Sequence, residues 1–267
     1  MAIRQISVRT LGELLDHCTP AEPDPRTGRR RDTGVYRGAF DAARPLLTSL
    51  DRLGGVDPPR TKTQLEANVL RNFVRYARPH VDQATPAGDW DNLVMAQHYG
   101  APTRLLDWSY SPLVAAHFAT RDVRRRGDYT PAVWRLDWQR LHDCFGFPHL
   151  ALLTQELERL LGGDRPMTPW RLFDDGADRP FACLVEPPSL DARIVVQAAT
   201  FTLCSDKTRS FDAFLAEHGL EDALTAFVFE PDETTRVRDQ LDMVGFDERR
   251  LFPDLEGVGA ALRRYYG

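Results

Sequence analysis

The sequence predicts an α+β fold in which a mixed or antiparallel sheet forms the core and helices are attached to it. Amphipathic helix patterns dominate residues 1–130, and strand patterns of β-branched and aromatic residues are spread over residues 131–267. No internal repeat or low-complexity segment appears in either part. This distribution is typical of α+β proteins. We therefore expect one domain over residues 1–267, whose weakest point for a division lies between Thr120 and Pro131.

The composition is that of a soluble globular protein, with 42% hydrophobic and 27% charged residues. The net charge of −5 gives no global basic field that would favour binding to nucleic acid or to an acidic membrane. The sequence contains no apolar run of the roughly 18 residues that a membrane span needs. Its first residues lack the apolar core of a signal peptide. The four cysteines are far apart, which favours reduced thiols. We expect a cytoplasmic protein.

Helix patterns in the first part begin and end at recognisable residues. Thr10 and Glu13 form a capping-box sequence that opens a short helix. Pro45 falls in the first turn of a possible helix that Gly54 ends. Ser111 followed by Pro112 is a favourable helix start, with Ser as N-cap and Pro at the first helical position. The expected helices in this part follow Thr10 and cover residues 42–53, 63–78, 89–99 and 111–120.

The remaining elements follow from apolar runs and from period-two patterns. The expected strands cover residues 34–40, 105–108, 132–137, 181–186, 192–203 and 225–229. The expected later helices cover residues 150–161, 210–218, 232–243 and 255–266.

The segment over residues 97–120 combines many polar side chains with an apolar helix pattern. Surface loops are usually richer in Lys and Glu, and core segments are usually poorer in polar groups. The mixture indicates a segment that lines a pocket. We interpret it as one half of a nucleotide-binding cleft, whose other half is Tyr36-Arg37-Gly38. Within fifteen residues it contains Gln97, His98, Tyr99, Thr103, Arg104, Asp107, Trp108, Ser109 and Ser111.

Arg37 lies within a strand pattern of Val, Tyr, Gly and Ala, so its guanidinium needs a carboxylate, phosphate or carbonyl partner. Two interpretations are open. The first is an internal ion pair, for example with Asp107. The second is a clamp on a nucleotide phosphate, in which Gly38 gives the ligand close access to the backbone.

Ser109 and Ser111 precede the same helix but differ in what explains them. The N-cap position accounts for Ser111. Ser109 has no such explanation and is placed near a helix N-terminus, where N–H groups and the helix dipole favour anions. We therefore expect Ser109 to meet a ligand.

The polar residues before this turn also have two interpretations. His98 at a helix C-terminus interacts favourably with the dipole, while Gln97 and Tyr99 offer hydrogen bonds to a base or ribose. Arg104 and Asp107 are three apart and can pair with each other. The spacing of the histidines is not that of a metal site.

Polar residues interrupt the apolar segment over residues 192–203. Arg193 and Gln197 lie within it, and the carboxylates of Glu186 and Asp191 precede it. An enzyme that stabilises a cationic sugar needs a carboxylate or another polar group of this kind. A polar strand edge that faces water explains Asp191 equally well and Glu186 better.

These residues together resemble the FRG-domain family, named after its aromatic-Arg-Gly motif. The family usually has a glycine between Gln197 and Phe201, where this sequence has Ala198 and Ala199. The resemblance runs in the same order through most of the chain. It is carried by Tyr36-Arg37-Gly38, Gln97-His98-Tyr99-Gly100, residues 102–108, the Ser-Pro helix that follows, Arg193, Gln197, Phe201 and Phe252-Pro253-Asp254-Leu255.

The organisation is also similar to that of ADP-ribosyltransferases of the Arg-Ser-Glu type, and this resemblance implies their kind of sheet core. Arg37 matches the Arg element. Ser109-Tyr110-Ser111, followed by an Ala-containing helix with Phe118, matches the Ser element. No Glu-x-Glu or Gln-x-Glu lies in residues 181–192, directly before Arg193, so Gln197 or Asp191 would take the third role.

The resemblance implies NAD as the substrate, with its phosphates near Arg37 and its nicotinamide ribose near Ser109. It implies transfer of ADP-ribose to a protein or nucleic acid, or hydrolysis of NAD, as in a bacterial toxin or antiphage effector. Two alternatives are open: a nuclease built on His98, Arg104 and Asp107, and a non-catalytic nucleotide-binding module. The expected catalytic residues are Arg37, Ser109, Gln197 and Asp191, and the expected NAD-binding residues are Tyr36, Arg37, Gly38, Gln97, His98, Tyr99, Thr103, Arg104, Asp107 and Ser111.

Overall fold

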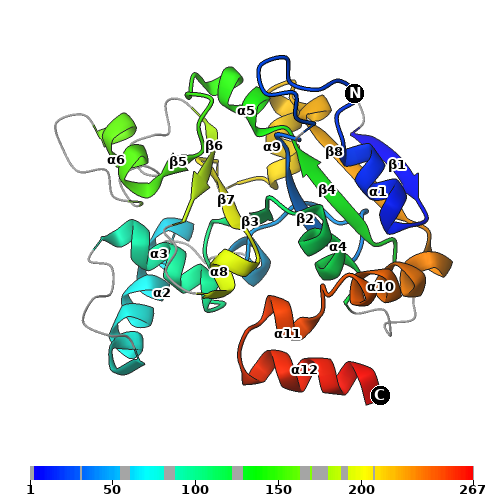
Figure 1. Cartoon of the computed structure of the whole chain (residues 1–267). Helices are drawn as coiled ribbons and strands as arrows, with labels where there is room; N and C mark the ends of the chain where they lie inside the picture. Colours follow the sequence, from blue (N-terminus) through cyan, green and yellow to red (C-terminus); the bar gives the residue numbers. More distant parts are fainter. Residues whose placement is uncertain are drawn as a thin grey trace.

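One eight-stranded sheet forms the centre of the protein, with the strand order β1-β8-β4-β2-β3-β7-β6-β5 (Figure 1). The computed structural model describes residues 3–30, 32–54, 61–80, 88–121, 129–162, 169, 180–187, 192–206 and 208–266. The pairs β1·β8 and β5·β6 at the two edges are parallel, and the other neighbouring strands are antiparallel. The predicted α+β class with a mixed sheet is therefore confirmed.

The strands are β1 (Arg4–Val8), β2 (Val35–Ala39), β3 (Leu106–Ser109), β4 (Ala132–Leu136), β5 (Leu152–Leu153), β6 (Ala182–Glu186), β7 (Ala199–Cys204) and β8 (Leu224–Phe229). The α-helices are α1 (Leu11–Cys18), α2 (Lys62–Ala77), α3 (Asp89–His98), α4 (Pro112–Thr120), α5 (Trp138–Phe145), α6 (Thr154–Gly162), α8 (Ala192–Val196), α9 (Phe211–Glu217), α10 (Thr234–Met243), α11 (Glu248–Leu251) and α12 (Leu255–Tyr266). Short 3₁₀ helices cover Asp51–Leu53, Arg78–His80, Glu221–Ala223 and Pro231–Glu233. None of the described helices is both long enough and apolar enough to cross a bilayer.

The sheet consists of two halves that meet between β2 and β3. Within the described residues, these two strands pair only where Tyr36 faces Ser109. By contrast, the ladder between β2 and β4 runs along the whole of β2, and the ladder between β3 and β7 runs along the whole of β3. Because β2 and β3 lie between β4 and β7, strands from before and after the segment between Thr120 and Pro131 share one sheet.

The apolar core is continuous on one face of the sheet and divided on the other. On the first face, α5 and α9 cover a single cluster that includes Trp108 and Trp134. On the second face, α2, α3 and α6 pack over β6 and β7, while α1, α4 and α10 pack over β2, β4 and β8. Asp107 faces Phe201 and Ser109 faces Tyr36 across the strands. Since cross-strand partners share a face, these two polar residues of β3 lie between the two apolar clusters.

One predicted element is wrong, and the predicted strand over residues 192–203 is wrong in its first half and confirmed in its second half by β7. Residues 42–50 form turns and irregular backbone and not a helix, because tertiary contacts take their backbone groups: Leu46 N donates to Asp212 Oδ1 at 2.7 Å, and Leu50 N donates to Thr103 O at 3.0 Å. Residues 192–196 form the helix α8 and not a strand. Ala198, with φ 45°, then turns the chain into β7.

Most other predicted elements are confirmed within one to four residues at their ends. These are the helices after Thr10 and over residues 63–78, 89–99, 111–120, 150–161, 210–218, 232–243 and 255–266, and the strands over residues 34–40, 105–108, 132–137, 181–186 and 225–229. The sequence patterns missed β1, β5, α5 and α11.

Candidate functional site

The Arg37 guanidinium lies at the junction of the two half-sheets. Nη1 donates to the main-chain oxygen of Asp107 at 2.7 Å and lies 3.5 Å from its carboxylate oxygen Oδ2. The Arg37 side chain is 18% exposed and that of Asp107 is 53% exposed. The predicted ion pair between these two residues is therefore confirmed. Among the described residues, Asp107 takes all the hydrogen bonds of this guanidinium, so Nε and Nη2 can still bind an anionic ligand.

Arg37 is a cation in a poorly hydrated place. Burial is the main cause that lowers its pKa; the Asp107 carboxylate opposes this effect, and Arg52 adds to it. An arginine remains protonated in spite of such a shift. The junction therefore holds the largely buried positive charge of Arg37 next to the exposed carboxylate of Asp107.

Gln97 at the end of α3 holds the Asp107 carboxylate from a second side. Its Nε2 donates to Asp107 Oδ1 at 2.6 Å, and its Oε1 accepts from the hydroxyl groups of Thr103 and Ser49. These contacts fix the orientation of the amide, since the two hydroxyls bind its oxygen and the carboxylate binds its nitrogen. Asp107 is thus oriented by two side chains and remains open to solvent.

A buried ion pair supports this network. The Arg104 main-chain N donates to Glu66 Oε1 at 2.8 Å, and Arg104 Nε contacts Glu66 Oε2. Both side chains are buried. Burial raises the pKa of Glu66, and Arg104 opposes this shift. The predicted pairing of Arg104 with Asp107 is wrong, because each finds another partner. Glu66 was missed, although a carboxylate on the buried side of α2 with Thr63 and Leu70 was a signal.

Ser109 joins β3 to the start of β7. Its Oγ donates to the main-chain oxygen of Gln197 at 2.7 Å and accepts from Ser111 N at 3.0 Å. Ser109 is only 5% exposed. The hydroxyl of Ser111 accepts from Val114 N at 3.4 Å, which confirms its predicted role as the N-cap of α4. The structure thus brings Ser109, Ser111 and Gln197 together, and it gives the Ser109 hydroxyl two main-chain partners.

Tyr36 and Gly38 have packing roles next to Arg37. The Tyr36 ring is buried, its hydroxyl contacts the Asp32 carboxylate, and burial raises its pKa. A Cβ at position 38 would lie 2.1 Å from the main-chain oxygen of Ala115 on α4. The helix can therefore approach β2 this closely only if residue 38 is glycine. Contact of either residue with NAD stays a prediction.

The other predicted site residues are spread around the junction. Tyr99 is exposed, with its ring 6.5 Å from that of Phe73, and His98 lies edge-on to Tyr99 at 5.0 Å. Asp191 lies outside the described residues. In the alternative nuclease site, Arg104 bonds to Glu66, and Asp107 bonds to Arg37 and Gln97. These hydrogen bonds do not join Arg104 or Asp107 to each other or to His98.

Glu186 is half-buried and bonded, where the sequence favoured a carboxylate that faces water. Its Oε1 accepts from the Tyr110 hydroxyl at 2.6 Å. Burial, followed by the contact with Glu186, raises the pKa of Tyr110. This contact connects β6 to the turn between Ser109 and Ser111. It was not visible in the sequence, because 76 positions separate the two residues.

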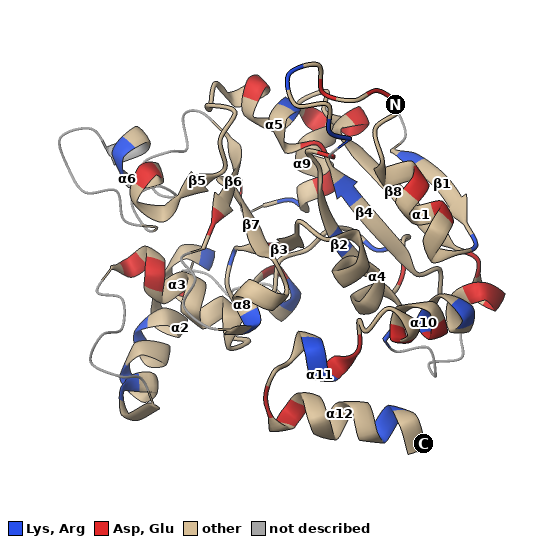
Figure 2. Ribbon diagram, in the orientation of Figure 1, with Lys and Arg blue, Asp and Glu red and all other residues tan. Residues whose placement is uncertain are grey.

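A cavity of about 30 Å³ lies next to Leu106 and Phe211, on the face of the sheet opposite to Ser109. This volume holds about two water molecules and no dinucleotide. Arg37 and Ser109 do not line it. Figure 2 shows positions of both charge signs spread over the fold, without a separate basic half.

Comparison with known proteins finds one family model that matches part of the chain. Residues 32–128 match the model of the FRG domain. This match supports the resemblance to the FRG-domain family over a stretch that includes β2, α2, α3, β3 and α4. Neither a curated protein nor a solved structure matches the chain.

Proposed function

We propose that the junction of β2, β3 and β7 binds NAD and that the protein is an NAD-consuming enzyme of the ADP-ribosyltransferase-like type. One observation carries this proposal. The Arg, Ser and third elements of that organisation lie on or next to adjacent strands, and the Ser109 hydroxyl contacts the Gln197 carbonyl directly at 2.7 Å. Arg37 follows Tyr36, the cross-strand partner of Ser109, so it leaves β2 on the opposite face of the sheet from Ser109, and its Nη1 reaches the Asp107 main chain of β3.

Arg37 is suited to bind the phosphates of NAD. Its guanidinium is held by one edge through Nη1, and the planar group presents further donors that match a phosphate. A guanidinium fixed in this way loses less side-chain entropy when the ligand binds. The NAD phosphates would therefore contact Nε and Nη2.

Asp107 is suited to the role of the third, Glu element, which residues 181–192 do not supply as Glu-x-Glu or Gln-x-Glu. Its side chain is exposed and lies on the same face of β3 as Ser109. Gln97 and Arg37 orient its carboxylate. Positive charge develops on the ribose when its bond to nicotinamide breaks, and a fixed carboxylate stabilises that charge. Ser109 and Gln197 support the turn next to it. The ribose carbon then bonds to a nucleophile on a macromolecule or to water. Such chemistry suits a bacterial toxin or antiphage effector in the cytoplasm.

The test is incubation of the protein with NAD that carries one label in nicotinamide and another in ADP-ribose, alone and with cell lysate or RNA. We expect release of nicotinamide, and transfer of the other label if a macromolecule is the acceptor. Asp107→Asn should lower the release by about 100-fold, the effect of losing one electrostatic group. Arg37→Ala should raise the NAD concentration needed for half-maximal rate. The matched control is Arg140→Ala, which removes an arginine from an exposed ion pair with Asp222 and should leave release unchanged.

Two other results would replace the proposal. Cleavage of RNA or DNA without NAD, and without nicotinamide release, would identify a nuclease. A rise of Tm with NAD but without release under any condition would identify a nucleotide-binding module.

A further inference from the structure

The C-terminal helices contact the turn that carries Ser109. Gln197 Nε2 donates to the main-chain oxygen of Leu251, the last residue of α11, at 2.9 Å. The main-chain oxygen of the same Gln197 accepts from the Ser109 hydroxyl at 2.7 Å. Gln197 therefore connects α11 to Ser109 through two consecutive hydrogen bonds. Ser109 in turn accepts from Ser111 N, so the connection reaches the first residue before α4.

A second contact holds the same region. The Arg193 guanidinium lies over the Phe252 ring, 4.6 Å from its centroid. Arg193 belongs to α8, which leads into Gln197, and Phe252 directly follows α11. The two contacts thus fix both the helix before the Gln197 turn and the turn itself to the C-terminal segment.

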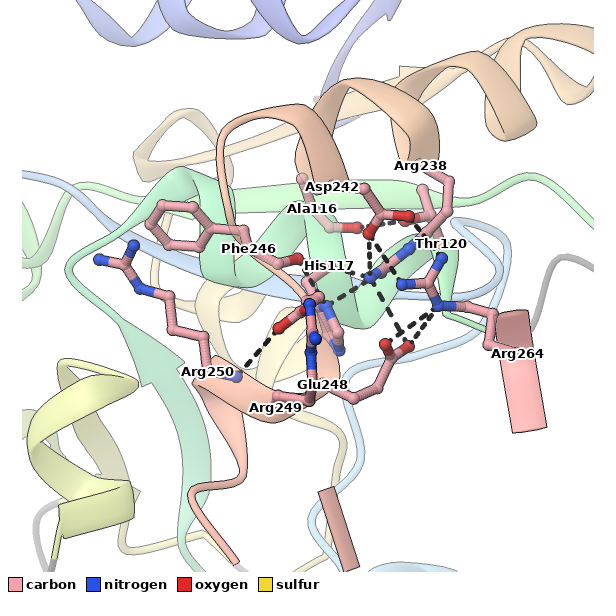
Figure 3. A network of polar contacts seen from close by, with 11 residues as sticks. Ala116, His117, Thr120, Arg238, Asp242, Phe246, Glu248, Arg249, Arg250 and Arg264 are labelled. Atoms are coloured by element: carbon pink, nitrogen blue, oxygen red, sulfur yellow. Dashed lines mark hydrogen bonds and ion pairs between the residues drawn. The ribbon is translucent and has the colours of Figure 1, made fainter. Parts of the chain in front are cut away.

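Glu248 on α11 anchors this segment to the rest of the fold (Figure 3). Its carboxylate accepts from Arg264 Nε at 2.9 and 3.0 Å and lies 3.6 Å from Arg238 Nη2. Arg264 also donates to both carboxylate oxygens of Asp242, at 2.6 and 2.8 Å. Arg238 Nη1 donates to His117 on α4 at 2.9 Å. These charged residues connect α4 and α10 to α11 and α12.

The ion pairs hold α12 in place, and apolar burial adds little. Within this helix only Gly257 is buried, and a Cβ there would lie 1.9 Å from the main-chain oxygen of Phe252. Its large apolar side chains are exposed, namely Leu255, Val258, Leu262, Tyr265 and Tyr266. The position of the helix therefore depends on Arg264, Glu248 and the close contact at Gly257.

We propose that residues 248–266 form a C-terminal strap that positions the Ser109 turn, with Gln197 as the positioning residue and Glu248 as the anchor. The effect of the strap on NAD affinity rests on the proposed function. The effect of the strap on the order of the Ser109 turn is independent of that function.

The test is amide hydrogen exchange of the full chain, measured over residues 110–116. Gln197→Met removes the bond to Leu251 while it keeps the length of the side chain, and Glu248→Gln weakens the anchor. Each variant should accelerate exchange in this segment about fivefold, which corresponds to the net contribution of one hydrogen bond. The matched control is Gln240→Met. It removes a similar bond, from Leu11 N to the Gln240 side chain, and should leave exchange in residues 110–116 unchanged.

The outcomes separate the two proposals. Faster exchange at residues 248–252 without any change at residues 110–116 would overturn the strap, whether or not NAD binds. If NAD binds the wild type, its Kd should rise about fivefold in Gln197→Met and stay unchanged in Gln240→Met. Equal Kd values in Gln197→Met and the wild type would overturn the role of the strap in ligand binding. If NAD does not bind the wild type, the proposed function fails and the exchange result alone decides the strap.

Discussion

Arg238 donates a hydrogen bond from Nη1 to Nδ1 of His117, at 2.9 Å, in the interior between α4 and α10 (Figure 3). A guanidinium has no acceptor atom, so Nδ1 must be the unprotonated nitrogen of this ring. His117 is therefore neutral, with its proton on Nε2. The 3.3 Å approach between Nδ1 and the Phe246 oxygen is then a contact between two acceptors, while Arg238 Nη2 donates to this oxygen at 3.4 Å.

Stability should fall when the pH is lowered toward the pKa of His117. Burial is the main cause that lowers this pKa to about 4, and Arg238 adds to the effect. An unfolded chain has the ordinary His value of about 6.5, so the unfolded state binds more protons between these two values. The stability is fully present above pH ~6.5, and it falls by about 3 kcal/mol as the pH approaches 4.

Urea unfolding at several pH values between 7 and 4.5 measures this dependence. His117→Asn keeps an acceptor for Arg238 and does not titrate, so its stability should change less over this range. An equal pH dependence in the variant and the wild type would show that other groups cause it.

Gly38→Ala should be strongly destabilising. The added Cβ would lie 2.1 Å from Ala115 O and 2.6 Å from Ala119 N, both main-chain atoms of α4 that cannot move separately. Overpacking of this kind costs about 1–3 kcal/mol or more. Gly12→Ala in α1 is the matched control, since its Cβ has no neighbour closer than 3.7 Å. It should instead stabilise by about 0.5–1 kcal/mol. Thermal unfolding measures both variants: the Tm should fall in Gly38→Ala and rise in Gly12→Ala.

Glu66→Ala should destabilise by about 3–5 kcal/mol, because it leaves the buried Arg104 charge without its carboxylate. The same variant removes the acceptor of Arg104 N and should loosen the segment that leads to Asp107. Asp222→Asn, which breaks the exposed pair with Arg140, is the comparison and should unfold at the wild-type urea concentration. Similar midpoints for the two variants would contradict the importance of the buried pair.

Ala198→Gly should stabilise the protein. Ala198 has φ 45°, the left-handed region that disfavours a Cβ, and it connects α8 to β7. Relief of this strain, reduced by the larger entropy of glycine in the unfolded chain, gives a gain of up to about 1 kcal/mol. Ala199→Gly, one residue later in β7, should destabilise by about 0.5–1 kcal/mol. A lower Tm for Ala198→Gly than for the wild type would show that the turn is not strained.

The sequence predicted elements well where local chemistry decides them. The start of α4 at Ser111 and Pro112 follows from capping alone. The helix predicted over residues 42–53 does not form, because Asp212 and Thr103 take backbone groups that a helix would use, and both are distant in sequence. The helix α5 was missed although Asp137 caps its start and Gly146 ends it in a left-handed conformation. The spacing of Trp138 and Leu141, which are buried on α5, also fits a helix.

The candidate site was predicted in part. Arg37 and Asp107 were both named, and their pairing was one of two open interpretations. The contacts that hold the site depend on residues far apart in the chain. Glu66 lies 38 positions from Arg104, and Gln197 lies 54 positions from Leu251. The buried position of Glu66 on α2 could be recognised, but no local pattern links either residue to its distant partner.

In the part of the chain that the structure describes, β2 and β3 pair at one position, and this has a mechanical consequence. A sheet resists bending through its ladder of interstrand hydrogen bonds, so we expect this one to bend most easily along the line where Tyr36 faces Ser109. Arg37 belongs to one half and Asp107 to the other. A molecule that binds both side chains would therefore link the two halves of the sheet. Its arrival would stiffen amides in both halves, including many that it never touches.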